Sequence, residues 1–342
     1  MIGFENIAKK IPVKIKLLKL MWLTMVIALA MGCNPQKGEP APGGKNQVSA
    51  PAKKAQAKPV IALVMKSLAN EFFKTMEDGA KAHQARHADE YELLSNGIKD
   101  EQDVSRQIDL VEQMIARKVS AIVIAPADSK ALVPVCKKAI DAGIAVVNID
   151  NRLDAKVKQD QGVKIPFVGP DNRKGAALAG EYLARRLNLG DKVAIIEGAP
   201  NAFNAVQRKF GFEDAATGRG LKVAVSQSAN WEMDKANQVV SAVITEHPDL
   251  KGILCANDNM ALGAVAALRS TGKDKSMLVA GFDNISAVQA LIKEGRVLCT
   301  VDQHADLLAV YGIEYALRMI KSNEQPADQE TPVNLVTIEN LK

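Results

Sequence analysis

Short, uninterrupted apolar runs alternate with helical patterns from Pro59 to the end of the chain. An apolar run of strand length without polar alternation is typical of a strand buried on both faces, as in a parallel sheet. Strands that alternate with helices make the repeated β-α-β units of such sheets. The pattern therefore predicts an α/β protein with parallel sheets.

The expected strands form two series, with a changeover near Gly169–Asp171. The first series is 60–65, 91–94, 121–125, 144–149 and 167–168, and the second is 193–197, 223–227, 252–256, 278–281 and 296–301. Helices are expected near 70 and at 104–117, 132–142, 175–187, 205–216, 235–246, 260–270, 285–294 and 305–321. We expect two similar, doubly wound (Rossmann-like) lobes, and the cleft between them is the default ligand site.

The net charge of +5 is unevenly distributed along the 342 residues. Residues 1–58 hold ten lysines and two acidic residues, so 59–342 retain 34 basic and 37 acidic residues, a net charge of −3. A nucleic-acid-binding protein is expected to concentrate basic charge in its folded part. The composition therefore argues against nucleic acid as a partner.

The basic leader has the features of a secretory signal peptide. Five lysines between Lys9 and Lys19 precede an apolar stretch from Leu20 to Met31, about a dozen residues, which is shorter than the roughly 20 needed to span a bilayer. The segment Leu29-Ala30-Met31-Gly32-Cys33 resembles a bacterial lipobox, which predicts a lipoprotein signal over 1–32 and lipidation of Cys33. Ordinary cleavage after Ala30, which leaves Cys33 as a free thiol, is the alternative.

Residues 33–58 are rich in Pro, Gly, Ala, Lys and Gln, which predicts a flexible linker. No later segment is long and apolar enough to suggest a transmembrane helix. The remaining cysteines, Cys136, Cys255 and Cys299, lie in apolar runs and are expected to be buried free thiols. We therefore expect a protein exported from the cytoplasm and held at a membrane or cell surface by its lipid.

Polar residues end several of the apolar runs. Asp150, Asn257, Asp283 and Gln303 each follow one, and ligands of open α/β sheets bind outside the carboxyl ends of the strands. Aromatic residues make up only 4% of the chain, so their positions are informative. The remaining residues expected at strand ends or helix starts are Phe72, Phe73, Asn151, Arg208 and Trp231.

These residue types together suit a sugar or a polyol. Aromatic rings stack on the C–H faces of a sugar, whereas Asp, Asn, Arg and Gln reach its hydroxyls, each of which both donates and accepts. A structural alternative exists for several of them. Asp258 is expected to cap the helix at 260–270, and Asp283 could cap the helix at 285–294. Arg208 could instead pair with Glu213 or Asp214 on its own helix, and Trp231 could pack on the surface of its lobe.

Motifs for catalysis are missing from the sequence. It contains no G-x-S-x-G, H-E-x-x-H or Walker A motif and no G-x-G-x-x-G after a strand. His83 and His87 are spaced for metal chelation on a helix, but the sequence places no third ligand near them. We expect no metal, no cofactor and no enzymatic activity.

At these residues the chain resembles the periplasmic sugar-binding proteins of ABC transporters, in the ribose/allose-like group. The motifs are Ile61–Phe73, Asn257–Ala264, Gly281-Phe282-Asp283 and Thr300–Gln303, and the resemblance covers about 59–342. It implies that ligand residues fall on Asn70, Phe72, Phe73, Asp150, Trp231, Asn257, Asp283 and Gln303. Lys66 is similar to the allose-type members, where ribose-type members carry Ser.

Two positions depart from the ribose-type pattern. That pattern has an Arg directly after the fourth-strand Asp, where this chain has Asn151. A second family Arg falls on Val206, while Arg208 matches another family Arg in the spacing Arg-x-x-Gly-Phe. Asn151 and Arg208 remain among the expected ligand residues, and the kind of sugar stays open.

The resemblance implies the type I periplasmic binding protein fold, in which a three-segment hinge joins the lobes. The lobes would span 59–169 plus 304–334 and 170–303 plus 335–342. The expected function is capture of a monosaccharide or sugar alcohol by a monomer, for delivery to an ABC permease with its ATPase. The alternatives are a sensing protein that signals to a chemoreceptor or sensor kinase, and an enzyme acting in the cleft. A sugar-responsive repressor has the same fold, but it carries an N-terminal helix-turn-helix where this chain has its leader.

Overall fold

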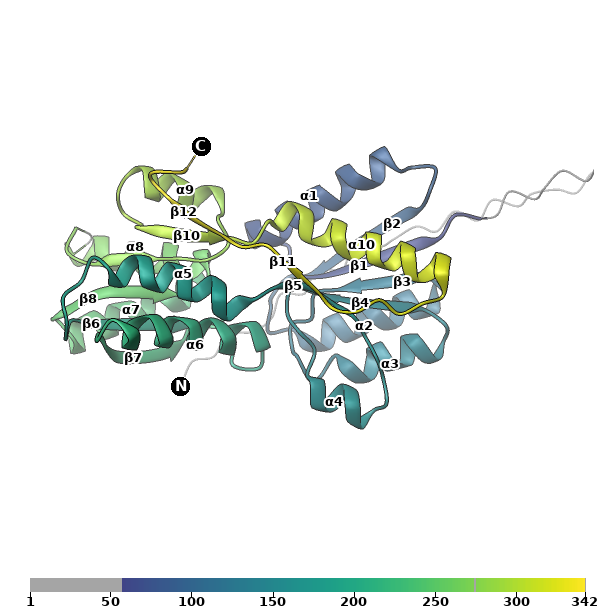
Figure 1. Cartoon of the computed structure of the whole chain (residues 1–342), viewed down its shortest axis with the longest axis horizontal. Helices are drawn as coiled ribbons and strands as arrows, with labels where there is room; N and C mark the ends of the chain where they lie inside the picture. The colour runs from purple at the N-terminus through teal and green to yellow at the C-terminus, as the bar shows by residue number, and fades with distance from the viewer. Residues whose placement is uncertain (1–56, 274, 342) are drawn as a thin grey trace, which may run out of the picture. The chain divides into compact units, whose positions relative to one another are not determined.

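The computed structural model describes residues 57–273 and 275–341, which contain two six-stranded sheets (Figure 1). The first sheet has the strand order β11-β5-β4-β3-β1-β2, and all its neighbouring strands are parallel. The second has the order β12-β10-β9-β8-β6-β7 and is parallel except for the pair β10–β12. The predicted signal peptide and Cys33, with the linker up to residue 56, lie outside the described residues.

Each sheet carries helices on its two faces. The first lobe contains β1 (Val60–Ser67), α1 (Glu71–Arg86), β2 (Glu92–Ile98), α2 (Val104–Ala116), β3 (Ala121–Ile124), α3 (Val133–Asp141), β4 (Ala145–Ile149), α4 (Ala155–Asp160), β5 (Phe167–Pro170), α10 (Ala305–Ser322) and β11 (Gln329–Thr331). The second contains α5 (Asn172–Ala184), β6 (Lys192–Glu197), α6 (Phe203–Gly218), β7 (Lys222–Ser228), α7 (Met233–Glu246), β8 (Leu250–Cys255), α8 (Asp258–Ser270), β9 (Leu278–Ala280), α9 (Ser286–Lys293), β10 (Cys299–Asp302) and β12 (Asn334–Thr337).

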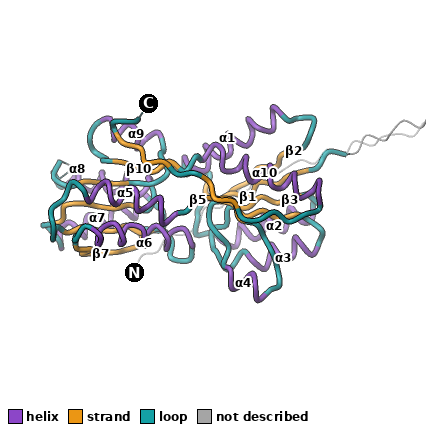
Figure 2. The backbone as a smooth tube through the Cα atoms, in the orientation of Figure 1, coloured by secondary structure: helices purple, strands orange, loops and turns teal. Residues whose placement is uncertain are grey.

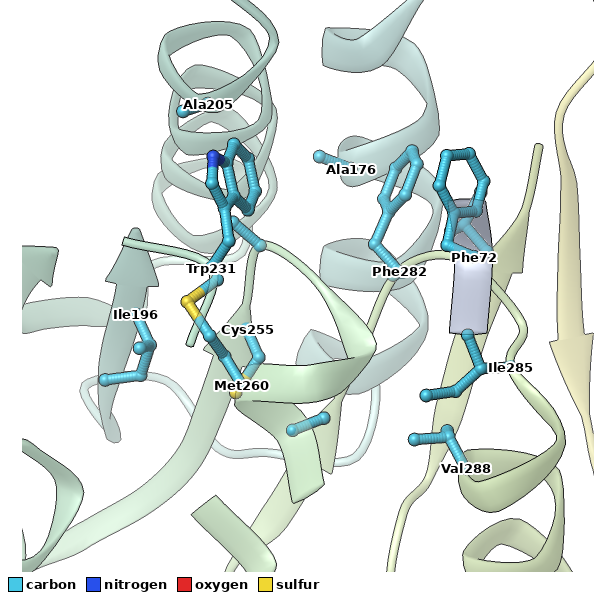
Figure 3. Packing of buried hydrophobic residues seen from close by; sticks show 14 of the residues in the cluster. Phe72, Ala176, Ile196, Ala205, Trp231, Cys255, Met260, Phe282, Ile285 and Val288 are labelled. Carbon is cyan, nitrogen blue, oxygen red and sulfur yellow. The ribbon is translucent and has the colours of Figure 1, made fainter. Parts of the chain in front are cut away.

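The apolar strands are buried on both faces, as their sequences predict. Ile61 and Leu63 of β1 face a core that includes residues of α1 and α10, whereas Ala62 and Val64 face another core built with α2 and α3. All four strand residues are fully buried. Because successive side chains of a strand point to opposite faces, one apolar run fills both cores. In the second lobe, Figure 3 shows Cys255 at the end of β8 next to Met260 of α8.

The described chain passes between the two lobes three times. The first crossing joins β5 to α5, the second joins β10 to α10, and the third joins β11 to β12. They can be followed in Figure 2, where the strands of both sheets are orange. The expected changeover near residues 169–171 coincides with the first crossing, and the fold class predicted from the sequence is confirmed.

Some elements differ from the sequence-based expectation. Helix α4 and strands β11 and β12 were not predicted, because they are short and polar and the strands depend on pairing with distant segments. Strand β10 begins at Cys299 and not at Arg296. The amides of Gly295, Arg296 and Val297 donate to Ile292 and Leu291 carbonyls, and Gly295 has φ +69°, so these residues close the end of α9.

Cys136, Cys255 and Cys299 are buried free thiols, as expected. Burial raises the pKa of the Cys136 thiol to about 12, which keeps it protonated and unreactive at neutral pH. Among the residues that the structure describes, no helix combines the length and apolarity that crossing a membrane requires.

Candidate ligand-binding site

A cavity of about 230 Å³ is lined by residues of both lobes at the carboxyl ends of their strands. The first lobe contributes residues from the end of β1, the start of α1 and the loops after β2 and β4, namely Lys66, Asn70, Phe72, Phe73, Glu101 and Asp150. The second contributes Asn204, Arg208, Trp231, Asn257 and Asp283, and Gln303 comes from the second crossing. The cavity therefore lies at the place that strand-end chemistry predicts.

The structure gathers ten of the eleven expected ligand residues around this cavity. Three of them, Asp150, Trp231 and Asp283, have positive φ angles of 62°, 72° and 125°. Residues other than Gly seldom adopt this backbone conformation, and its occurrences cluster at functional sites. Each of the three follows a strand or the loop after one, and each side chain lines the cavity. The unusual backbone thus orients these side chains toward the cavity.

Lys66 forms the charged centre of the first-lobe side. Its Nζ lies 3.0 Å from Asp150 Oδ2 and 3.8 Å from Glu101 Oε2, and only 2% of its side chain is exposed. The same Nζ lies 5.6 Å from the ring centroid of Phe73 and 5.8 Å from that of Trp231. One buried ammonium group is thus shared by two carboxylates and two aromatic rings, one ring from each lobe.

Glu101 is a cavity residue that the sequence did not reveal. Burial and, to a smaller extent, the nearby Asp150 raise its pKa to about 7 against the opposing charge of Lys66. Glu101 also lines a second, larger groove next to the cavity, whose other lining residues include Ser67 and Asp234. It stands in the segment Lys99-Asp100-Glu101 after an edge strand, and such a charged run is typical of a solvent-exposed loop.

Arg208 and Asp283 form the charged centre of the second-lobe side. Arg208 Nη1 donates to Asp283 Oδ1 at 3.4 Å and to the carbonyl of Ala256 at 2.8 Å, and its Nε donates to Asn172. Gln303 Nε2 donates to the same Asp283 oxygen at 2.7 Å. The alternative pairing of Arg208 with Glu213 or Asp214 is wrong, because Asp214 pairs with Arg173 and Glu213 with Lys209. Burial raises the pKa of Asp283, and Arg208 opposes that rise.

Aromatic side chains form the apolar walls. Phe72 and Phe73 meet edge to face with centroids 5.1 Å apart, and both are nearly fully buried, so they serve the core and the cavity together. Trp231 is 5% exposed, so the alternative that it packs on the lobe surface is wrong. A Cβ added at Gly198 would lie 2.2 Å from the Trp231 ring, so a glycine is needed for the ring to sit there. Figure 3 shows the Trp231 ring above Met260 and near Cys255.

Two asparagines of the cavity begin helices in corresponding places of the two lobes. Asn70 Oδ1 accepts from the amide of Phe72 at the start of α1, and Asn257 Oδ1 accepts from the amide of Met260 at the start of α8. The expectation that Asp258 caps α8 is wrong. Asp258 is fully buried inside the first turn, where its carboxylate accepts from the Thr300 hydroxyl and from the amide of Ile285.

Besides Asp150 Oδ2, which has only its ion pair with Lys66, three polar atoms of the cavity residues lack a hydrogen-bond partner within the described chain. They are Trp231 Nε1, a donor, and Asn204 Oδ1 and Gln303 Oε1, both acceptors. A buried polar atom without a partner is unfavourable by about 1–3 kcal/mol, so its presence at a cavity favours a ligand that completes it. A hydroxyl-rich ligand can both donate to and accept from such a set.

Asn151 does not line the cavity, although it was expected there. It is fully buried, and its Nδ2 donates to the carbonyl of Pro126 at 2.9 Å, while its Oδ1 accepts from the amide of Asn204 at 3.1 Å. Because the backbone of Asp150 is left-handed, the side chain of Asp150 lines the cavity while that of Asn151 contacts Asn204 instead. Asp283 does not cap α9 either, since α9 begins without a side-chain cap.

Two α/β lobes with three crossings and a shared cavity define a bilobal solute-binding protein of type I. The chain belongs to the periplasmic binding protein family, since the family described as "Periplasmic binding protein domain" matches residues 61–324. The family and fold expected from the resemblance are confirmed. The chain is 60% identical over 284 residues to the D-ribose/D-allose-binding protein of Pseudomonas aeruginosa, which covers 82% of this chain and 89% of that protein.

Solved structures give the same family. An ABC transporter solute-binding protein from Burkholderia multivorans is 57% identical with a TM-score of 0.81, covering 82% of this chain and 100% of that one. A periplasmic solute-binding protein from Actinobacillus succinogenes with bound D-allose is 38% identical with a TM-score of 0.78, covering 82% of this chain and 98% of that one.

Proposed function

We propose that this protein captures a monosaccharide, of the D-ribose or D-allose type, between its two lobes and delivers it to an ABC transporter permease. The observation that carries the proposal is the cavity itself, which both lobes line. The first lobe contributes Lys66, Phe73 and Asp150, and the second contributes Arg208 and Asp283. A ligand that contacts both lobes stabilises their closed arrangement, because only differential contacts shift a conformational equilibrium.

The size of the cavity supports a small ligand. Its empty space is about 230 Å³, part of which is open to solvent. Charged groups on both sides, aromatic rings and partnerless polar atoms match a single sugar ring with several hydroxyls. One relative named above is named for D-ribose and D-allose and another has bound D-allose, which makes an aldose the first candidate.

Ten residues are proposed to contact the sugar, and Glu101 and Asn204 join them because they line the same cavity. The ten are Lys66, Asn70, Phe72, Phe73, Asp150, Arg208, Trp231, Asn257, Asp283 and Gln303. The carboxylates and Arg208 would make the strongest hydrogen bonds, since charged partners are stronger than neutral ones. The bound sugar is expected to be released chemically unchanged.

Transport is favoured over the sensing alternative, because relatives are named as import or ABC transporter binding proteins. The partners would be a membrane permease with its ATPase, and the protein would act as a monomer in the periplasm or at the cell surface. A lipid on Cys33, after removal of the signal peptide over 1–32, would hold it at the membrane. Cys33→Ser should then move the protein from the membrane fraction to the soluble fraction.

Thermal-shift measurements against a panel of monosaccharides and polyols test the proposed ligand class. A bound ligand raises the melting temperature by mass action, so D-allose, D-ribose or a related aldose should give the largest shift. Disaccharides and amino acids serve as controls and should give none. A panel in which no sugar or polyol raises the melting temperature would contradict the proposal.

A further inference from the structure

A second set of contacts joins the lobes outside the ligand cavity. The loop after β3 in the first lobe meets the segment before α6 in the second. Ser129 N donates to the carbonyl of Asn201 at 3.1 Å, and Asn201 Nδ2 donates to Asp128 Oδ2 at 2.8 Å. These bonds involve no residue of the ligand cavity, so in this arrangement of the lobes they form without a contribution from a ligand.

Two further bonds reach the first turn of α6. The amide of Phe203 donates to Ser129 Oγ at 2.9 Å, and the amide of Asn204 donates to Asn151 Oδ1 at 3.1 Å. Phe203 and Asn204 are the first two residues of α6, whose N-cap residue Ala202 provides no side-chain acceptor. A helix needs acceptors for its first amides, and its own N-cap side chain usually supplies one. Here the acceptors come from the other lobe.

Both acceptors are held firmly in the first lobe. Ser129 and Asn151 are 5% and 0% exposed. Asn151 Nδ2 donates to Pro126 O at 2.9 Å and contacts Ser129 Oγ at 3.2 Å. Contacts within the first lobe therefore hold both acceptors, and Ala202, with φ −102° and ψ 124°, has the extended backbone of an N-cap.

Helix α6 carries two residues of the ligand cavity, Asn204 in its first turn and Arg208 one turn later. We propose that Ser129 and Asn151 together form an N-cap that the first lobe supplies to α6 of the second lobe, and that this trans-lobe cap favours the closed arrangement and orients Asn204 and Arg208 for the ligand. Ser129 and Asn151 are positioning residues, because they act through α6 and do not line the cavity. The inference rests on the proposed function, since it concerns closure of the lobes on the same ligand.

The cap has a consequence for affinity. When the lobes separate, the first amides of α6 lose these acceptors and bind water instead. The hydrogen bonds of the cap therefore stabilise only the closed arrangement. The apparent dissociation constant equals the intrinsic one divided by the closed fraction. Loss of one such cap should therefore weaken ligand binding by up to about 5-fold and should act mainly by faster release.

The test compares Ser129→Ala and Asn151→Ala with the unaltered full chain. Small-angle scattering of the ligand-free protein should give a larger radius of gyration for both variants. Calorimetry and stopped-flow fluorescence with D-allose should give a dissociation constant raised by up to about 5-fold and a dissociation rate raised by a similar factor. The scattering result does not need a sugar, so it decides the inference even if D-allose fails to bind and the proposed function is wrong.

Asp154→Ala is the matched control. Asp154 Oδ1 caps α4 within the first lobe by accepting from Val157 N at 2.8 Å, only three residues from Asn151. Its loss should lower stability but leave the radius of gyration and the dissociation rate unchanged. A second variant, Ala202→Ser, gives α6 a cap of its own in both arrangements; it should keep or raise stability while weakening D-allose binding.

The inference is overturned if Ser129→Ala and Asn151→Ala melt at lower temperature yet retain the scattering profile and the dissociation rate of the unaltered protein. It is also overturned if Asp154→Ala shifts the radius of gyration as much as they do. Either result would mean that these hydrogen bonds stabilise the fold without favouring closure of the lobes. Unchanged D-allose binding in Ala202→Ser, with increased stability, would likewise contradict a role in closure.

Discussion

Lys66 Nζ and Asp150 Oδ2 lie 3.0 Å apart, and the side chains of both residues are only 2% exposed. The pair joins the end of β1 to the residue after β4, with β3 between the two strands. A buried ion pair adds little to stability by comparison with an apolar pair, but losing one partner leaves an uncompensated charge. The pair is therefore better understood as part of a ligand site than as a stabilising device.

Lys66→Met should lower the free energy of unfolding by about 3 kcal/mol, because it leaves Asp150 and Glu101 without their buried cation. Urea unfolding at neutral pH measures the change. Lys74→Met is the control, since the Lys74 side chain is half exposed and its pair with Asp78 lies on the surface. That variant should unfold like the unaltered protein. Equal stability of Lys66→Met and the unaltered protein would contradict an uncompensated charge.

Asp283→Asn should weaken sugar binding about 100-fold while the fold is kept, because the charged acceptor shared by Arg208 and Gln303 becomes neutral. Calorimetric titration with D-allose and D-ribose measures the change. Asn257→Ala should also weaken binding, but it removes the cap of α8 and should lower stability by about 1 kcal/mol as well. Unchanged affinity in both variants would remove these residues from the ligand site.

The free energy of unfolding should fall as pH rises from about 4.5 to about 7. Burial raises the pKa of Glu101 from 4.5 to about 7, and burial raises that of Asp258 to about 7 as well. In this pH window the folded protein binds more protons than the unfolded chain, so stability decreases with rising pH. Glu101→Gln should make the decrease smaller. Denaturant unfolding at several pH values checks both; a stability curve that rises through this window would contradict the buried carboxyl groups.

Gly198→Ala should weaken sugar binding at least about 10-fold, because the added methyl group would occupy the place of the Trp231 ring. Trp231 is one of two tryptophans in the chain, and the other, Trp22, lies in the predicted signal peptide, so tryptophan fluorescence of the processed protein reports its displacement. Gly218→Ala is the matched control, because nothing lies within 4 Å of its added Cβ. If the two variants had equal affinities, the close packing of Gly198 on Trp231 would be unimportant.

The sequence predicted the two lobes and most of the cavity because both depend on local patterns. An apolar run followed by a polar residue marks the carboxyl end of a parallel strand, so Asp150, Asn257 and Asp283 could be placed near one another without a structure. The aromatic pair Phe72 and Phe73 follows the same logic, since it begins the helix after the first strand.

What the sequence did not predict depends on side-chain direction and on contacts between distant segments. Glu101 follows an edge strand in a charged loop, and only the folded chain brings it beside Lys66. Asn151 follows Asp150 directly, yet the backbone turn sends its side chain toward the other lobe. The cap of α8 was misassigned by one residue, because Asp258 turns inward to bond Thr300 and leaves Asn257 as the cap.

The positive φ angles of Asp150, Trp231 and Asp283 also limit how such a site can change over evolution. Residues other than Gly seldom adopt a positive φ, and β-branched residues are strongly disfavoured there, whatever the ligand. Few substitutions at these three positions would therefore be available to selection for a new sugar. Diversity would accumulate at cavity positions with ordinary backbone, such as Lys66, and libraries for altered specificity should be concentrated there.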